Sequence, residues 1–165
     1  MRFTVSQSSL AKALSVVSKG IASHSTIPVL GGILMRASNG TLEMQTSDLD
    51  TSIRHKIAAN VEEGETVISG RMLSNVVKNL QDSAVTFDGG EGTINVTCDK
   101  SSFHLNTLNA SEFPSFPEIA MERSVELPCD VLSEMVDKVY KVTSRDTSRP
   151  VLAGILLNVE ENCVR

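Results

Sequence analysis

The sequence predicts an α+β fold in which two strand–helix–three-strand (βαβββ) motifs form a domain, with the helices on one side of antiparallel sheets. Three observations predict it. The segment RPVLAGILL at residues 149–157 repeats IPVLGGILM at residues 27–35. The order strand, helix, strand, strand, strand occurs twice in the residues between these segments and around them. Turns of hairpin length separate most of the predicted strands, and such turns join antiparallel neighbours.

The first motif begins with an alternating strand and continues with an amphipathic helix at Ser8–Ile21. Apolar residues recur there at the 3.6-residue period of a helix, and Gly20 lies where the helix should end. Pro28–Met35 is a nearly continuous apolar run, which predicts a buried strand. Asn39-Gly40 is a strong signal for a hairpin turn. The four strands of this motif are expected at residues 2–5, 28–35, 41–46 and 52–57.

The second motif repeats this order before residue 109. Its helix is predicted at Arg71–Leu80, where Leu73, Val76, Val77 and Leu80 share one face. Short glycine-containing and polar turns separate its last three strands. Its strands are expected at residues 66–69, 84–88, 93–98 and 102–108.

A second copy of the unit begins near residue 123. At a constant offset of 122 residues, Phe3 falls on Val125 and six of the eight residues from Pro28 to Met35 recur identically. The segment Phe113–Pro117 contains two prolines and is the expected linker. We therefore expect a complete first domain at residues 1–122 and the beginning of a second at 123–165, so that the natural protein is longer. The second copy predicts a strand at 124–127, a helix at 130–143 and a strand at 151–159.

Composition is that of an ordinary globular protein, with 41% hydrophobic and 21% charged residues among 165. No apolar run approaches the roughly 18 residues of a membrane span, and the N-terminus lacks a signal-peptide core. The three cysteines, Cys98, Cys129 and Cys163, are odd in number and far apart. This favours a reducing compartment over a disulfide framework, so we expect a cytoplasmic protein.

The formal net charge is −5, but the charges are unevenly distributed. Residues 1–42 contain four cations and no acid, whereas residues 43–67 contain six acids. Basic charge that is carried by helices within an acidic total can present a local positive face to a polyanion. The simpler alternative is that these are solvated helix faces.

Motifs of enzymatic chemistry are absent from the sequence. It has no GxxxxGK phosphate loop, no GxGxxG after a strand, no GxSxG elbow and no HExxH or CxxC spacing. Asp48 and Asp50 could hold Mg²⁺, although a solvated turn before the next strand is the simpler interpretation. We therefore expect no catalytic residues, no metal and no cofactor.

Several segments closely resemble the bacterial DNA polymerase III beta subunit family, the replicative sliding clamps. They are MRFTV at the N-terminus, IPVLGGIL, TSDL, FHLNTL, EFP and RPVL. The resemblance extends through all 165 residues and covers the first of the family's three domains and the start of the second. It implies the sliding-clamp fold and a ring-shaped, head-to-tail homodimer that encircles duplex DNA. Such a ring tethers polymerase and catalyses nothing.

The resemblance also implies a DNA-binding surface. It places His24 in a loop near the DNA backbone, where relatives often have arginine, and Arg71 at the start of the second helix. It places the loop Asp146–Arg149 against DNA as well. The remaining residues implied to face the central hole are Lys19, Lys78, Lys141 and Arg145.

Two protein-binding surfaces follow from the same resemblance. Arg149 and Leu152 resemble part of the hydrophobic pocket that binds peptide motifs of the polymerase III catalytic subunit, the clamp loader and other clamp-binding proteins. The alternative for Leu152 is a core residue like its counterpart Leu30. Phe103 and Leu105 resemble a subunit-interface edge, or else belong to the sheet core. A small repeat-built domain that binds protein through its acidic face remains the alternative function.

Overall fold

The computed structural model describes residues 1–22, 25–90, 92–118, 124–146, 148–160 and 163–165. The chain divides into two compact units, Met1–Glu118 and Ile119–Arg165. Each unit is considered separately below.

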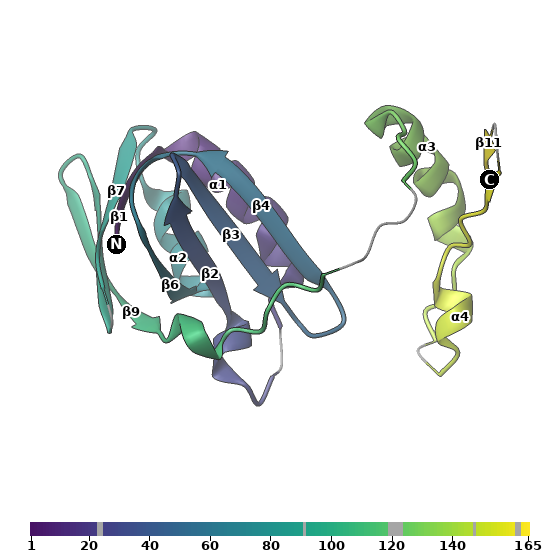
Figure 1. Ribbon diagram of the computed structural model, residues 1–165, viewed down its shortest axis with the longest axis horizontal. Coiled ribbons are helices and arrows are strands. Elements are labelled where there is room, and N and C mark those ends of the chain that lie inside the picture. The colour runs from purple at the N-terminus through teal and green to yellow at the C-terminus, as the bar shows by residue number, and fades with distance from the viewer. Residues whose placement is uncertain (23–24, 91, 119–123, 147, 161–162) are drawn as a thin grey trace. The chain divides into compact units, whose positions relative to one another are not determined.

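The first unit is a single nine-stranded antiparallel sheet in the order β4-β3-β2-β6-β9-β8-β7-β1-β5 (Figure 1). The long strand β9 joins its two halves, because it pairs with β8 along most of its length and with β6 only at Thr107 and Leu108. The short β5 is not predicted by the sequence pattern. The strands are β1 Arg2–Ser6, β2 Gly32–Ser38, β3 Thr41–Ser47, β4 Ser52–Ala58, β5 Asn60–Glu62, β6 Gly64–Ser69, β7 Ala84–Gly89, β8 Thr93–Cys98 and β9 Ser101–Leu108.

Two helices cover one face of this sheet, as predicted (Figure 1). They are α1, Gln7–Val17, which continues into a 3-10 turn, and α2, Gly70–Asn79. Ser6 caps α1, since its hydroxyl accepts a hydrogen bond from the Ser9 amide at 3.3 Å. The buried faces of both helices join alternate residues of every long strand in one core. Phe3 and Phe87 stack within it at 4.5 Å.

Close approach of the backbone fixes the helix layer on the sheet. The Thr46 hydroxyl donates to the carbonyl of Val17 at 2.7 Å, and both groups are buried. A Cβ at Gly20 would lie 2.7 Å from the Thr46 hydroxyl oxygen, and one at Gly70 would clash with the Ile21 side chain. Glycine is therefore needed where α1 ends and where α2 begins.

A smaller apolar cluster lies on the opposite face of the sheet. Leu34 and Val67 point there because their neighbours in sequence point into the main core. A 3-10 turn at Pro28–Gly31 covers them together with Phe113. The strand predicted at 28–35 is thus wrong in its first half. Proline has no N–H for a sheet, and the Leu30 amide donates to the Ile27 carbonyl within the turn instead.

The regular structure described in the second unit is mostly helical. It contains α3, Cys129–Val139, a 3-10 turn at Tyr140–Val142, α4, Pro150–Ala153, and a hairpin of β10, Val159–Glu160, with β11, Cys163–Val164. The predicted helix at 130–143 is confirmed, but the strand predicted at 124–127 is wrong and the one predicted at 151–159 is a strand only at its last residue. In the first unit the equivalent strands pair with β3, β5, β6 and β7. The described residues here contain a counterpart only for the start of β3, and it forms β11, which pairs with β10. None of the described helices is long and apolar enough to cross a bilayer.

Candidate nucleic-acid interface

The outward face of the helix layer in the first unit carries only positive charge. Its four exposed cations are Lys12 and Lys19 from α1 and the turn after it, and Arg71 and Lys78 from α2. Residues 7–20 and 70–79 contain no aspartate or glutamate. No ion pair within the described part of the chain involves any of the four. Their charge is therefore available to a polyanion.

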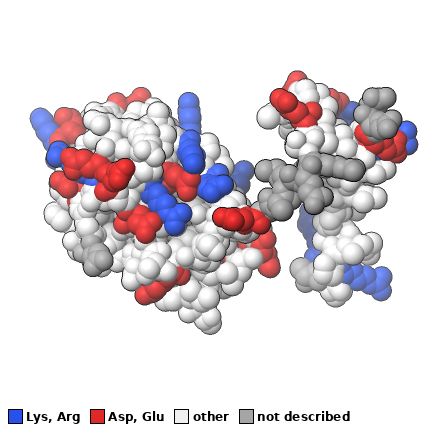
Figure 2. All heavy atoms as spheres, in the orientation of Figure 1, with Lys and Arg blue, Asp and Glu red and all other residues white. Residues whose placement is uncertain are grey.

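The opposite, sheet side of the unit carries charges of both signs, some of them in ion pairs. Arg36 pairs with Glu65 at 2.8 Å, and Lys56 pairs with Glu43 at 3.0 Å. Figure 2 shows the resulting mixture of acidic and basic side chains on the side of the unit seen in Figure 1. These two cations have acidic partners, whereas those on the helices do not. The net negative charge of the chain thus coexists with a positive helix face.

The two helices are tied side by side. The Gln7 side-chain amide donates to the Val77 carbonyl at 2.8 Å, and the hydroxyls of Ser18 and Ser74 lie 3.4 Å apart. Between them runs a groove of about 350 Å³ that is lined by serine hydroxyls, aliphatic groups and the side chain of Lys78. These donors suit phosphate oxygens. The arrangement can hold a nucleic-acid backbone, but it does not project a helix that would read bases.

The cations that helix periodicity predicts on the outward face of the helices are exposed there. Lys19, Arg71 and Lys78 are exposed on the helix layer. Lys12 is not among the residues predicted for this site, although its seven-residue spacing from Lys19 predicts one stripe along α1 and the turn after it. His24 lies outside the described residues.

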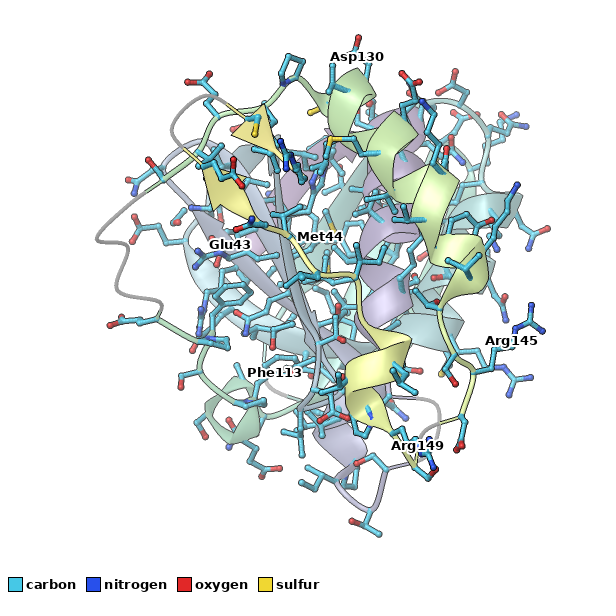
Figure 3. The ribbon with its side chains drawn as sticks, turned by 90° about the vertical axis from the view of Figure 1, so that its right-hand side faces the viewer. Glu43, Met44, Phe113, Asp130, Arg145 and Arg149 are labelled. Atoms are coloured by element: carbon cyan, nitrogen blue, oxygen red, sulfur yellow. The ribbon has the colours of Figure 1, made fainter. Side chains whose placement is uncertain are left out.

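The second unit exposes further cations in and around one loop. Lys141 lies in the turn after α3, and Arg145 and Arg149 flank the loop before α4 (Figure 3). Asp146 lies between them and accepts a hydrogen bond from the Ser148 amide at 2.9 Å. Hydrogen bonds from the side chain and backbone of Ser148 lower the pKa of Asp146 below its ordinary value. An ionised carboxylate repels phosphate, so the geometry favours a role for Asp146 in shaping the loop.

A family model for the DNA polymerase III beta subunit, N-terminal domain, matches residues 1–117. The chain belongs to this family. Its relatives include a beta sliding clamp homolog, GriR, of Streptomyces muensis, which is 37% identical over 97% of this chain and 43% of its own length. A beta sliding clamp of Micrococcus luteus is 30% identical over 99% of this chain and 53% of its own length. The chain therefore spans about half the length of the curated relatives it matches.

Solved sliding clamps share the fold. The DNA polymerase sliding clamp of Bacillus subtilis superimposes with a TM-score of 0.90 at 29% identity, over 98% of this chain and 45% of that one. The Helicobacter pylori beta clamp bound to a DNA ligase peptide gives 0.86 at 26% identity, over 95% of this chain and 44% of that one. The predicted sliding-clamp fold is confirmed.

The residues expected to form part of a peptide pocket lie at or beside a groove of the second unit. Leu152 is 52% exposed among the described residues, whereas its counterpart Leu30 is 1% exposed. Leu152, Val151 and Leu156 line an apolar groove of about 330 Å³. Arg149 precedes α4 and is exposed.

The two residues expected at a subunit interface have different environments. Leu105 is 3% exposed and belongs to the main core, so its side chain cannot contact a partner and this assignment is corrected. Phe103 is 37% exposed. Both lie on the part of β9 that pairs with β8 on one side but with no described strand on the other. The open backbone edge and Phe103 remain available to another chain.

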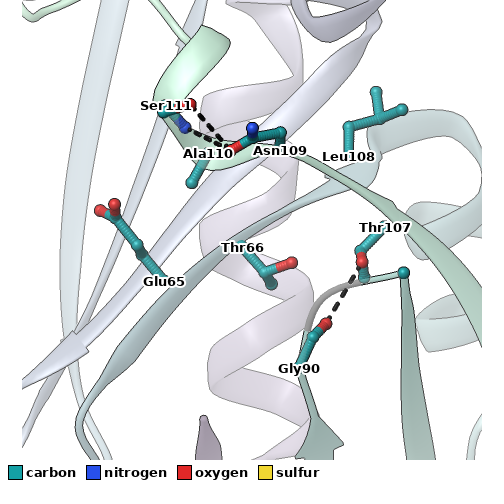
Figure 4. Close-up of a pocket in the computed structure, with 9 residues that line it drawn as sticks. Glu65, Thr66, Gly90, Thr107, Leu108, Asn109, Ala110 and Ser111 are labelled. Atoms are coloured by element: carbon teal, nitrogen blue, oxygen red, sulfur yellow. Dashed lines mark hydrogen bonds between the residues drawn. The ribbon is translucent and has the colours of Figure 1, made fainter.

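Beside this edge, where β6 and β9 diverge, lies a polar pocket of about 480 Å³ (Figure 4). The Thr107 hydroxyl donates to the Gly90 carbonyl, and the Asn109 side-chain oxygen accepts from the amide and hydroxyl of Ser111. The carboxylate of Glu65 is engaged by Arg36. These polar groups already have hydrogen-bond or ion-pair partners within the protein. Among the described residues that line the pocket, no nucleophile lies next to a base.

The aspartates considered as metal ligands form a tight turn. Asp48 Oδ1 accepts hydrogen bonds from the amides of Asp50 and Thr51, at 3.1 and 2.6 Å. This is the bonding of a turn-forming aspartate. No group of three potential metal ligands occurs among the described residues.

We predict that Leu105→Ala lowers the free energy of unfolding by about 2–5 kcal/mol, because it leaves a cavity in the core. Phe103→Ala should cost less than about 1 kcal/mol, since its side chain keeps much of its exposure in the folded state. Urea unfolding of the 165-residue chain followed by circular dichroism measures both. Equal losses of stability in the two variants would contradict the division into core and edge.

We predict that the pKa of Asp146, followed by NMR titration, lies below the ordinary aspartate value of about 3.9. Ser148→Ala should raise it, whereas Ser148→Thr, which keeps the hydroxyl, should not. Because the folded-state pKa is depressed, the ionised carboxylate stabilises the loop above the ordinary pKa, and this stabilisation disappears as the pH falls through the folded-state value. A wild-type pKa at or above the ordinary value would refute this role of Ser148.

Proposed function

We propose that this chain is part of a DNA polymerase processivity factor. The complete protein would be a ring-shaped clamp that encircles duplex DNA and tethers the replicative polymerase without catalysing a reaction. Membership of the beta subunit family supports this. The observation that carries it is the helix layer. Its four exposed cations have no ion-pair partner among the described residues, and residues 7–20 and 70–79 contain no acid, whereas Arg36 and Lys56 on the sheet side are paired with glutamates.

In this proposal the helix layer faces DNA as a diffuse positive field. Lys12, Lys19, Arg71 and Lys78 are long side chains on a rigid layer, and they can attract phosphates without fixing any one register. Such contacts carry no sequence information. A protein held by them can slide, because neighbouring registers on the duplex have nearly equal energy. Lys141, Arg145 and Arg149 of the second unit would extend the same field.

Partners other than DNA would use two surfaces. The groove lined by Leu152, with Arg149 beside it, would receive peptide motifs of the polymerase III catalytic subunit, the clamp loader and other clamp-binding proteins. A DNA ligase peptide bound to the Helicobacter pylori clamp supports this class of partner. The open edge of β9, with Phe103, would join subunits head to tail in a cytoplasmic homodimer.

We predict that reversing the helix-face cations, Lys12→Glu, Lys19→Glu, Arg71→Glu and Lys78→Glu together, weakens binding of the 165-residue chain to duplex DNA at low salt by more than about tenfold. The slope of log affinity against log salt should fall by about 0.9 for each phosphate that the variant no longer neutralises. Fluorescence anisotropy with two unrelated duplex sequences measures both quantities. The affinity for each duplex should fall by the same factor.

The matched control reverses the charge of three cations on the sheet side by the substitutions Arg36→Glu, Arg54→Glu and Lys56→Glu. It alters net charge by a similar amount while leaving the helix layer unchanged, so DNA affinity should fall far less. Equal losses of affinity in the two variants would show that only net charge matters. Wild-type binding that does not depend on salt would favour a protein-binding domain instead.

A further inference from the structure

The two copies of the repeated segment differ in what covers their apolar residues. In the first unit Val29, Leu30 and Leu34 are each about 1% exposed. Their counterparts at an offset of 122 residues are Val151, Leu152 and Leu156, which are 89%, 52% and 86% exposed and line one groove. The described residues of the second unit contain no counterpart of Val67 or Phe113, the two residues that cover these side chains in the first unit.

In the first unit the filling group is Phe113. Its side chain is 8% exposed and packs in a cluster with Val29, Leu30, Leu34 and Val67. A short 3-10 turn at Ala110–Glu112 places the Phe113 side chain in this cluster. The Phe113 amide donates to the Ala110 carbonyl of the turn at 3.1 Å. Asn109 caps this turn through the Ser111 amide. The aromatic ring thus enters the apolar site from a segment that follows the last strand of the unit.

The residues after Phe113 are held by side chains of the sheet. The Gln45 side-chain nitrogen donates to the Pro114 carbonyl at 3.3 Å, and the Arg54 guanidinium lies 4.2 Å from the centre of the Phe116 ring. Gln45 and Arg54 are cross-strand partners on β3 and β4. Residues 113–116 therefore follow the sheet surface, held through a carbonyl and a ring, without strand pairing.

Gln45 provides an independent sign that this surface is built to bind a peptide. Its side chain is 1% exposed, and its Oε1 atom has no hydrogen-bond partner in the described structure. Burying an amide group that lacks hydrogen-bond partners costs free energy. A buried glutamine side chain therefore needs hydrogen bonds within the protein. The bond to Pro114 supplies that contact only for the nitrogen. The site retains an unused acceptor that a backbone N–H could satisfy.

We propose that the first unit contains its own apolar socket for an extended peptide with an aromatic side chain, and that residues 113–116 are its built-in ligand. The socket consists of Val29, Leu30, Leu34 and Val67, with Gln45 and Arg54 at its side. The built-in ligand closes the socket to other peptides. It also holds the chain against the first unit as far as Phe116.

The test uses the 165-residue chain and a fluorescent peptide with the sequence of residues 109–118, NASEFPSFPE. Wild-type protein should not bind it, because the socket is filled. Phe113→Ala should bind it, and a peptide carrying the same alanine change should not bind. Phe113→Leu should restore closure. Binding to wild type as tight as to Phe113→Ala, or no binding to a folded Phe113→Ala, would overturn the proposal.

If Phe113→Ala does not fold, a second variant keeps the apolar socket intact. Gln45→Ala with Arg54→Ala should lower the backbone order parameters of Ser115 and Phe116, measured by NMR relaxation, since both side chains that hold this segment are removed. Order parameters in β8 should stay unchanged, which shows that the unit remains folded. Lys56→Ala, an exposed position on the same strand β4, is the matched control. Order parameters at Ser115 and Phe116 that match the control would contradict the proposed binding by these two side chains.

Discussion

The packing of two helices on a single face of one continuous sheet is the constraint on which the other features of the first unit depend. Burying α1 and α2 there brings the backbone at Gly20 and Gly70 against the side chains of Thr46 and Ile21, and the bond from Thr46 to Val17 secures the layer. Once one side of each helix is buried, its remaining polar residues must share one outer surface. Charge that is scattered along the sequence is thereby gathered in space.

Charge segregation follows from this geometry without any special local structure. The sheet side carries both signs, and Arg36, Glu43, Lys56 and Glu65 neutralise one another in pairs whose members are exposed except for Glu43. Such pairs contribute little to stability, about 0–1 kcal/mol each. Their larger effect is to remove those cations from the long-range field. The helix layer therefore determines where a polyanion is attracted, even though the chain as a whole is acidic.

Local patterns predict most of the first unit and fail where structure depends on distant partners. Helix periodicity and hairpin turns predict α1, α2 and most strands, because those signals are contained in a few residues. Alternation cannot separate Leu105 from Phe103, since both lie on one face of β9, and only the folded sheet buries one more than the other. Most residues of the strands expected in the second unit form no strand, because a strand forms only with a neighbour. Resemblance places Asp146 against DNA, and its bond from Ser148 becomes visible only in the folded loop.

The repeated segments show how far identical residues can differ in role. Val29 and Val151 occupy equivalent positions in nearly identical sequences, yet one is buried and the other is almost fully exposed. Neither the residue nor its immediate neighbours determine this. In the first unit the covering group comes from a segment about 80 residues downstream, because Phe113 packs in one cluster with Val29. The described residues of the second unit contain no counterpart of Phe113 or of Val67, so neither group covers Val151 there. Burial of an apolar residue in this motif is therefore decided by distant residues of the same unit, and the motif alone cannot predict it.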